Sequence, residues 1–158
     1  MWVVSTDRAR CRDCYRCVRE CPVKAIAVRS AQAEVVEQLC IACGTCIRAC
    51  PQDAKRSRDD LTLVKTALAE GRRVAASVAP SFPAFLPVTQ VGQLVELLHN
   101  LGFWSVDETA VGAEVTAQAH AQYVAEHPEA RPVICSACPV VVFLIEKHHP
   151  ELISIWRQ

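Results

Sequence analysis

The chain has 158 residues, ten of them cysteines, and its 17 Lys and Arg balance its 17 Asp and Glu, so its formal charge at pH 7 is zero. With 51% hydrophobic and 22% charged residues, the composition is that of a folded protein of one domain or two small ones. The zero net charge excludes the overall basic field on which nucleic-acid binding depends.

Export and membrane insertion are not predicted. The first residues lack the apolar core of a secretory signal, and the longest uninterrupted apolar run, residues 140–145, is far below the roughly 20 residues that cross a bilayer. We therefore expect a cytoplasmic protein without a membrane span. In that reducing compartment, ten cysteines indicate metal binding rather than disulfides.

The first part of the chain contains an internal repeat. Two cysteine runs, CRDCYRCVRECPVKA and CIACGTCIRACPQDA, share the pattern CxxCxxCxxxCP. At one constant offset, the cysteines of the first run recur in the second, Cys11 as Cys40, Cys14 as Cys43, Cys17 as Cys46 and Cys21 as Cys50. Three thiolates at this spacing can wrap around three irons of a cubane, which then needs a fourth ligand. Structural zinc is the alternative, because CxxC pairs also form tetrahedral sulfur sites, although zinc sites usually draw on two pairs.

Over residues 5–60 the sequence resembles the bacterial two-cluster ferredoxins, on all eight cysteines and both following prolines. The resemblance implies an α+β, ferredoxin-like two-cubane domain over residues 1–60, with two 4Fe-4S clusters as cofactors. Tyr15 is a departure, since the second run has Gly44 there, which more readily adopts a positive φ. The fourth cysteine of each run is implied to ligate the other cluster, so the two ligand sets are Cys11, Cys14, Cys17 and Cys50, and Cys40, Cys43, Cys46 and Cys21.

After a charged linker at residues 53–60, helices and strands alternate. We expect helices over 61–70, 91–101, 110–127 and 139–148, and strands over 72–79, over 103–108 and around Val133 and Ile134. Gly71, Gly102 and Pro128 are placed to end the first three helices, and Pro139 suits the first turn of the last. This alternation predicts an α/β domain with a parallel sheet over residues 61–158.

The segment Cys135-Ser136-Ala137-Cys138 follows the last predicted strand, where α/β sheets bind ligands. It also precedes a helix, whose amino-terminal dipole favours thiolates and negatively charged groups. The alternative is a pair of buried small residues flanking a turn.

Three stretches, VAASVAPSFPAFLP, LGFWSVDETAVGAEVTAQAHA and PVICSACPVVVFLIEKHHPELI, resemble the amino-terminal half of the catalytic domain of iron-only (FeFe) hydrogenases. In that family a motif close to TSCCP supplies a cysteine ligand of the hydrogen-activating cubane, preceded by a proton-relaying cysteine. The resemblance implies that Cys138 is a possible ligand of such a cubane and that Ala137 stands at the relay position, with Cys135 as a further candidate. Alanine cannot exchange a proton, and in this the sequence is more similar to the sensory members of the family.

The later cysteine motifs of that family are not in this sequence, so we expect a fragment or a truncated relative, related to the hydrogenases but not catalytically complete. The predicted function is iron–sulfur electron transfer through two 4Fe-4S clusters to the hydrogenase-like domain. There are two alternatives. The chain is a piece of a sensory or catalytic hydrogenase, in which a third cubane forms only if further ligands are supplied, or it is a structural zinc-binding module. The expected partner is a redox protein or the missing carboxyl-terminal part, in an anaerobic organism.

Overall fold

The computed structural model describes residues 3–87, 90–129 and 132–157. It divides into two compact units, Met1–Arg58 with Ala130–Gln158, and Asp59–Glu129. The predicted division into domains 1–60 and 61–158 stays a prediction, because spatial grouping does not define which segments fold independently.

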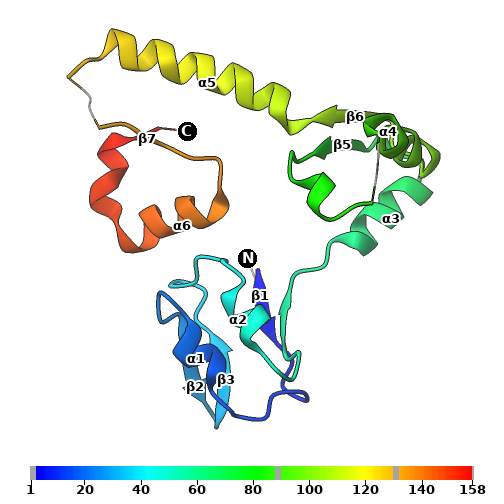
Figure 1. Ribbon diagram of the computed structural model, residues 1–158. Coiled ribbons are helices and arrows are strands. Elements are labelled where there is room, and N and C mark those ends of the chain that lie inside the picture. Colours follow the sequence, from blue (N-terminus) through cyan, green and yellow to red (C-terminus); the bar gives the residue numbers. More distant parts are fainter. Residues whose placement is uncertain (1–2, 88–89, 130–131, 158) are drawn as a thin grey trace. The chain divides into compact units, whose positions relative to one another are not determined.

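The repeat is visible in the backbone of the amino-terminal part of the chain (Figure 1). Three elements of the first repeat, β1 (Val4–Thr6), α1 (Arg16–Glu20) and β2 (Ile26–Arg29), recur as β3 (Gln32–Val35), α2 (Thr45–Ala49) and β4 (Lys55–Ser57). β1 pairs with β4 and β2 pairs with β3, both antiparallel. Each two-stranded sheet therefore takes one strand from each repeat, and neither repeat completes a sheet alone.

Cysteines form much of the core between these elements. Cys17, Cys21 and Cys46 are buried together with small and β-branched residues, and Cys40 packs against them. The apolar members of this core are Val4, Ala25, Ile26, Ala33 and Val35. A domain of this length buries little apolar surface, so whatever the thiols bind contributes directly to its stability.

Both helices begin from a residue in the left-handed region. Gly44 precedes α2 with φ 73°, and Tyr15 precedes α1 with φ 53°, so the tight loop expected at Gly44 also forms with tyrosine. The Tyr15 hydroxyl donates a hydrogen bond to the carbonyl oxygen of Ala31 at 3.1 Å. This bond offsets part of the cost of a left-handed tyrosine.

Gly44→Ala is expected to destabilise the start of α2 by about 1–2 kcal/mol. A Cβ at Gly44 meets nothing within 4 Å, so the cost arises from the backbone alone. The amides of Ile47 and Arg48, which donate to the Gly44 carbonyl, should then exchange their hydrogens roughly 5- to 30-fold faster. Gly112→Ala is the control, because that glycine lies within a helix in open space and the substitution should slow local exchange. Unchanged exchange at Ile47 in Gly44→Ala would contradict the prediction.

The second unit confirms the predicted alternation to within a few residues. Its elements are α3 (Leu61–Ala69), β5 (Ala75–Val78), a 3-10 turn (Phe82–Ala84), α4 (Val91–Asn100), β6 (Ser105–Glu108) and α5 (Thr109–Glu126). Gly71 and Gly102 follow α3 and α4 with φ 69° and 100°, as helix-ending glycines do. β5 and β6 are parallel, joined through α4.

The segment after residue 131 contains β7 (Ile134–Cys135), α6 (Pro139–His148), a 3-10 turn (Pro150–Ile155) and β8 (Trp156–Arg157). The expectation of one parallel sheet through all three predicted strands needs correction. Among the described residues, β7 pairs only with β8, also in parallel, so the strands form two separate pairs. Alternation along the chain predicts a crossover connection, but it does not determine which strands become neighbours.

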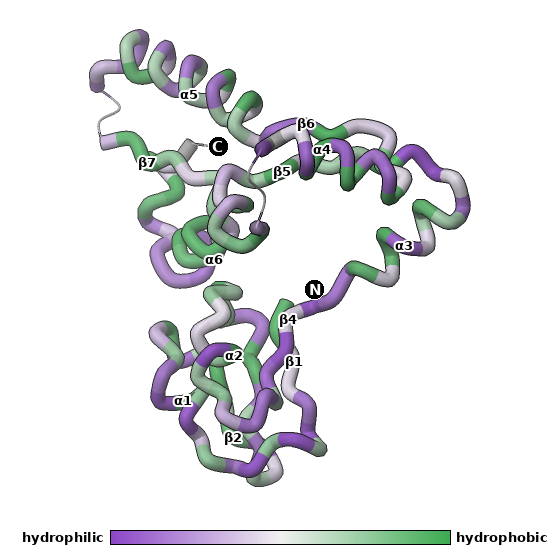
Figure 2. The backbone as a smooth tube through the Cα atoms, turned by 45° about the vertical axis from the view of Figure 1, so that its right-hand side comes forward, coloured by the Kyte–Doolittle hydropathy of each residue, from purple (hydrophilic) through white to green (hydrophobic). Residues whose placement is uncertain are grey.

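The two units differ in how much apolar surface they cover. In the described part of the second unit Leu94 alone is buried, whereas Phe85, Val111 and Val115 are largely exposed. Figure 2 shows hydrophobic residues concentrated in α6 and interspersed with hydrophilic ones along α5. No helix in the described parts of the chain combines the length and apolar character needed to span a bilayer.

Candidate functional site

The repeat places the eight cysteines of the two runs in equivalent positions. Cys17 lies in α1 and Cys46 in α2, both with buried side chains. Cys21 and Cys50 follow these helices directly, each with an extended backbone. The remaining four, Cys11, Cys14, Cys40 and Cys43, lie in the loops that precede the helices.

Backbone N–H groups point at three of the sulfurs. The amide of Ala25 donates to Cys21 Sγ and the amide of Ala54 to Cys50 Sγ, both at 3.2 Å, and the amide of Ala42 donates to Cys40 Sγ at 3.4 Å. These donors stabilise negatively charged sulfur. Hydrogen bonds to sulfur are also among the factors that set the potential of a protein-bound iron–sulfur cluster.

The electrostatics of the thiols shows which of them are neighbours. Burial raises the pKa of Cys17, while the positive charge of Lys55 lowers it and the nearby thiolates of Cys50 and Cys11 raise it further. Cys17, from the first run, is therefore a neighbour of Cys50, from the second.

Cys46 has the same kind of environment in the other half. Burial raises its pKa to about 11, Lys55 again opposes the shift, and Cys40 and Cys43 are the first of its thiolate neighbours. For Cys50, burial raises the pKa, but hydrogen bonds from the Ala54, Gln52 and Lys55 amides outweigh burial and leave the pKa below its ordinary value.

A side-chain contact also links the two runs. Cys14 Sγ lies 3.6 Å from Gln52 Oε1, and Gln52 closely follows Cys50. This brings the second cysteine of the first run beside the end of the second run. In the structure Cys17 is thus a charge neighbour of Cys11 and Cys50, with Cys14 beside Gln52. Cys21, Cys40, Cys43 and Cys46 line one small pocket together. Cys17 and Cys46 also interact through their charges, so the two groups of thiols adjoin.

The donor set fits the chemistry of iron–sulfur clusters. It consists of soft thiols, partly buried, with N–H groups directed at the sulfurs. Within the described ranges, no three His, Cys, Asp or Glu side chains converge on the position of one metal ion. A cubane attaches each thiolate to a different iron, so its ligands stand farther apart than those of a single ion.

The second cysteine pair lies where the sequence predicts, between the end of a strand and the start of a helix. Cys135 ends β7 and Cys138 immediately precedes Pro139, the first residue of α6. Both thiols are exposed, and the Cys138 amide donates to Ser136 Oγ at 3.1 Å. The alternative of buried small residues is therefore wrong for these two side chains, which are open to a ligand.

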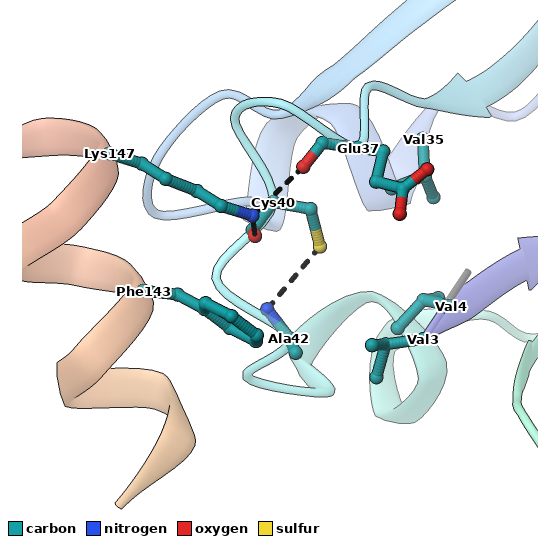
Figure 3. A pocket seen from close by; sticks show the side chains of 8 residues that line it. All are labelled: Val3, Val4, Val35, Glu37, Cys40, Ala42, Phe143 and Lys147. Carbon is teal, nitrogen blue, oxygen red and sulfur yellow. Dashed lines mark hydrogen bonds between the residues drawn. The ribbon is translucent and has the colours of Figure 1, made fainter. Parts of the chain in front are cut away.

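The carboxyl-terminal turn of α6 contacts the loop that holds Cys40 (Figure 3). Lys147 Nζ donates to the carbonyl oxygens of Cys40 at 2.7 Å and Glu37 at 3.0 Å, and a ring nitrogen of His148 lies 2.8 Å from the Leu39 carbonyl oxygen. The Lys147 ammonium lies over the Phe143 ring, 4.5 Å from its centroid, and both side chains line a small, mainly apolar cavity of about 190 Å³. Sequence reasoning missed these contacts, because a lysine in the last turn of a helix is explained by the helix dipole alone.

The amino-terminal and carboxyl-terminal parts of the chain match two different protein families. Residues 3–65 match the profile described as a 4Fe-4S dicluster domain. Residues 72–156, more than half of the chain, match the profile described as the iron only hydrogenase large subunit, C-terminal domain. The chain belongs to this hydrogenase family. The predicted order of a dicluster domain followed by an FeFe-hydrogenase domain is thereby confirmed. No curated protein matches the chain.

Within this hydrogenase-family chain, the eight cysteines of the repeat lie inside the dicluster match, and Cys135 and Cys138 lie inside the hydrogenase match. The iron–sulfur character of the first part is therefore shown at the level of the family. Which cysteine holds which cluster stays a prediction.

Proposed function

We propose that the chain is an iron–sulfur electron-transfer module whose first part holds two 4Fe-4S clusters. The observation that carries this proposal is the repeated core, in which two equivalent cysteine runs meet between sheets built from both repeats. Clusters of this type supply one-electron redox chemistry when bound. The redox partner is another protein or a further part of the hydrogenase-like domain, and the setting is cytoplasmic and anaerobic.

The proposed ligands follow the cross-linked arrangement. One cluster takes Cys11, Cys14, Cys17 and Cys50, and the other takes Cys40, Cys43, Cys46 and Cys21. In support of the first set, Cys50 and Cys11 are charge neighbours of Cys17, and Gln52 contacts Cys14. Because each set combines both runs, the two clusters lie close together, as stepwise transfer of single electrons requires.

A second candidate function is supported by the match over residues 72–156 and by the two exposed thiols before α6. In it the chain is part of a sensory or catalytic FeFe hydrogenase. Cys138, with Cys135 as a further candidate, ligates an additional cubane that is completed by ligands from elsewhere. Ala137 cannot exchange a proton, so this candidate favours redox or hydrogen sensing over rapid hydrogen turnover.

Iron, zinc and acid-labile sulfide per chain, measured on protein purified without oxygen, test these candidates together. About eight irons and eight sulfides support two cubanes with the second cysteine pair empty. About twelve of each would move the hydrogenase-like function to the front. Zinc without sulfide would overturn the proposal and leave a structural zinc module.

A further inference from the structure

Lys55 occupies an unusual place in the first unit. Its side chain is 2% exposed, and among the described residues it is the one charged side chain that is fully buried. The ammonium donates to the Thr6 hydroxyl and, at 2.8 Å, to the Ala33 carbonyl oxygen. No ion pair with a carboxylate is found for it in the described part of the chain.

The internal repeat shows what the fold itself requires at this position. At the constant offset of the repeat, Lys55 is the counterpart of Ile26. Its strand partner Thr6 is in the same way the counterpart of Val35. Thr6 pairs with Lys55 as Val35 pairs with Ile26, and both Ile26 and Val35 are buried. The same backbone position thus accepts an apolar pair in one half and a hydroxyl–ammonium pair in the other.

A buried ammonium is costly unless negative charge lies nearby. The acceptors that hold it are neutral, but it enters the core that contains Cys17 and Cys46. Its charge acts on the thiols of Cys17, Cys46 and Cys50. Two of these belong to one proposed ligand set and one to the other, so the positive charge acts on sulfurs of both sets.

We propose that Lys55 is an internal counter-cation that raises the reduction potentials of the two clusters and makes them unequal, an inference that rests on the proposed function. Reduction adds one negative charge to a cluster, and a nearby fixed positive charge in a poorly screened interior favours that state. Ile26 supplies no such charge at the equivalent place. The larger effect is expected on the cluster held by Cys11, Cys14, Cys17 and Cys50, because the charge of Lys55 acts on two of its thiols, Cys17 and Cys50.

Two variants test the charge separately from the packing. Lys55→Gln keeps a hydrogen-bond donor, on a shorter side chain, and removes the charge. The double variant Thr6→Val with Lys55→Ile rebuilds the apolar pair that the other half already contains, so it retains a packing known to suit this backbone. Lys24→Gln is the matched control, because it removes one exposed positive charge from the same unit, where solvent screens it.

The measurement is an anaerobic redox titration followed by electron paramagnetic resonance, with iron and sulfide content determined on each sample. In both Lys55 variants the ratio of reduced to oxidised cluster at a fixed potential should fall about tenfold, a shift of about 59 mV, for at least one cluster. Lys24→Gln should change it less than threefold. Unchanged potentials in variants with full iron and sulfide would overturn the role of Lys55, whereas wild-type protein without iron and sulfide would overturn the proposed function instead.

Discussion

Replacing Cys17 and Cys50 together by alanine is expected to leave one cluster intact, whereas replacing Cys17 and Cys21 together is expected to remove both. The reason is the proposed exchange of the fourth ligand between the runs. Cys17 and Cys50 then serve the same cluster, although they come from different repeats. Cys17 and Cys21 serve different clusters, although they belong to the same run.

Iron analysis and visible absorbance of the anaerobic proteins decide between the two arrangements. The first double variant should keep about four irons per chain and the second close to none. Removing Cys135 and Cys138 together is the control for two lost thiols, and it should leave about eight irons. If each run held its own cluster, the results of the first two variants would be interchanged, and the cross-linked ligand sets would be wrong.

Removing the clusters is expected to unfold the first unit while leaving the second unchanged. Cys17, Cys21 and Cys46 form part of the buried core, so empty thiols leave that core poorly filled. Burial of Cys46 disfavours its charged form, and bound metal is what stabilises the thiolate. Small metal-dependent domains gain about 10 kcal/mol or more from their metal, which matches the whole stability of a typical domain.

Hydrogen exchange with and without clusters measures this effect. The amides of β2 and β3, protected by their strand pairing, should lose most of their protection after anaerobic chelation. Residues 59–129 contain no cysteine, so α5 provides an internal control whose exchange should stay the same. Retained protection in β2 and β3 of the metal-free protein would show that the apolar residues suffice to fold the unit.

Most local structure could be predicted because the sequence carries its signals within a few residues. The constant offset between the two cysteine runs predicts two equivalent halves of the dicluster domain. Gly71 and Gly102 mark where helices end, because they readily adopt a positive φ, and Pro139 marks where a helix starts. The positive φ of Gly44 was also predictable, although Tyr15 shows that a residue other than glycine, held by a hydrogen bond, can occupy the left-handed region.

What could not be predicted depends on contacts between distant segments. From the sequence, a lysine in a short strand is expected at the surface. The equivalent position of the first repeat holds the apolar Ile26, and comparing these two positions would have predicted that Lys55 is buried. The pairing of β7 with β8 and the bond from Lys147 to the Cys40 carbonyl join segments that no periodicity relates. Ligand assignment depends on three-dimensional proximity in the same way.

The pairing of β1 with β4 has a consequence for the architecture of larger proteins. Val4 lies opposite Ser57, and the Arg58 amide donates to the Val3 carbonyl oxygen at 2.9 Å, so the polypeptide enters and leaves the dicluster fold at one point. A fold with adjoining ends can be inserted into a surface loop of another protein, or reconnected in a new order, without stretching either strand. A dicluster domain of this kind can therefore be added to unrelated chains without rearranging its strands.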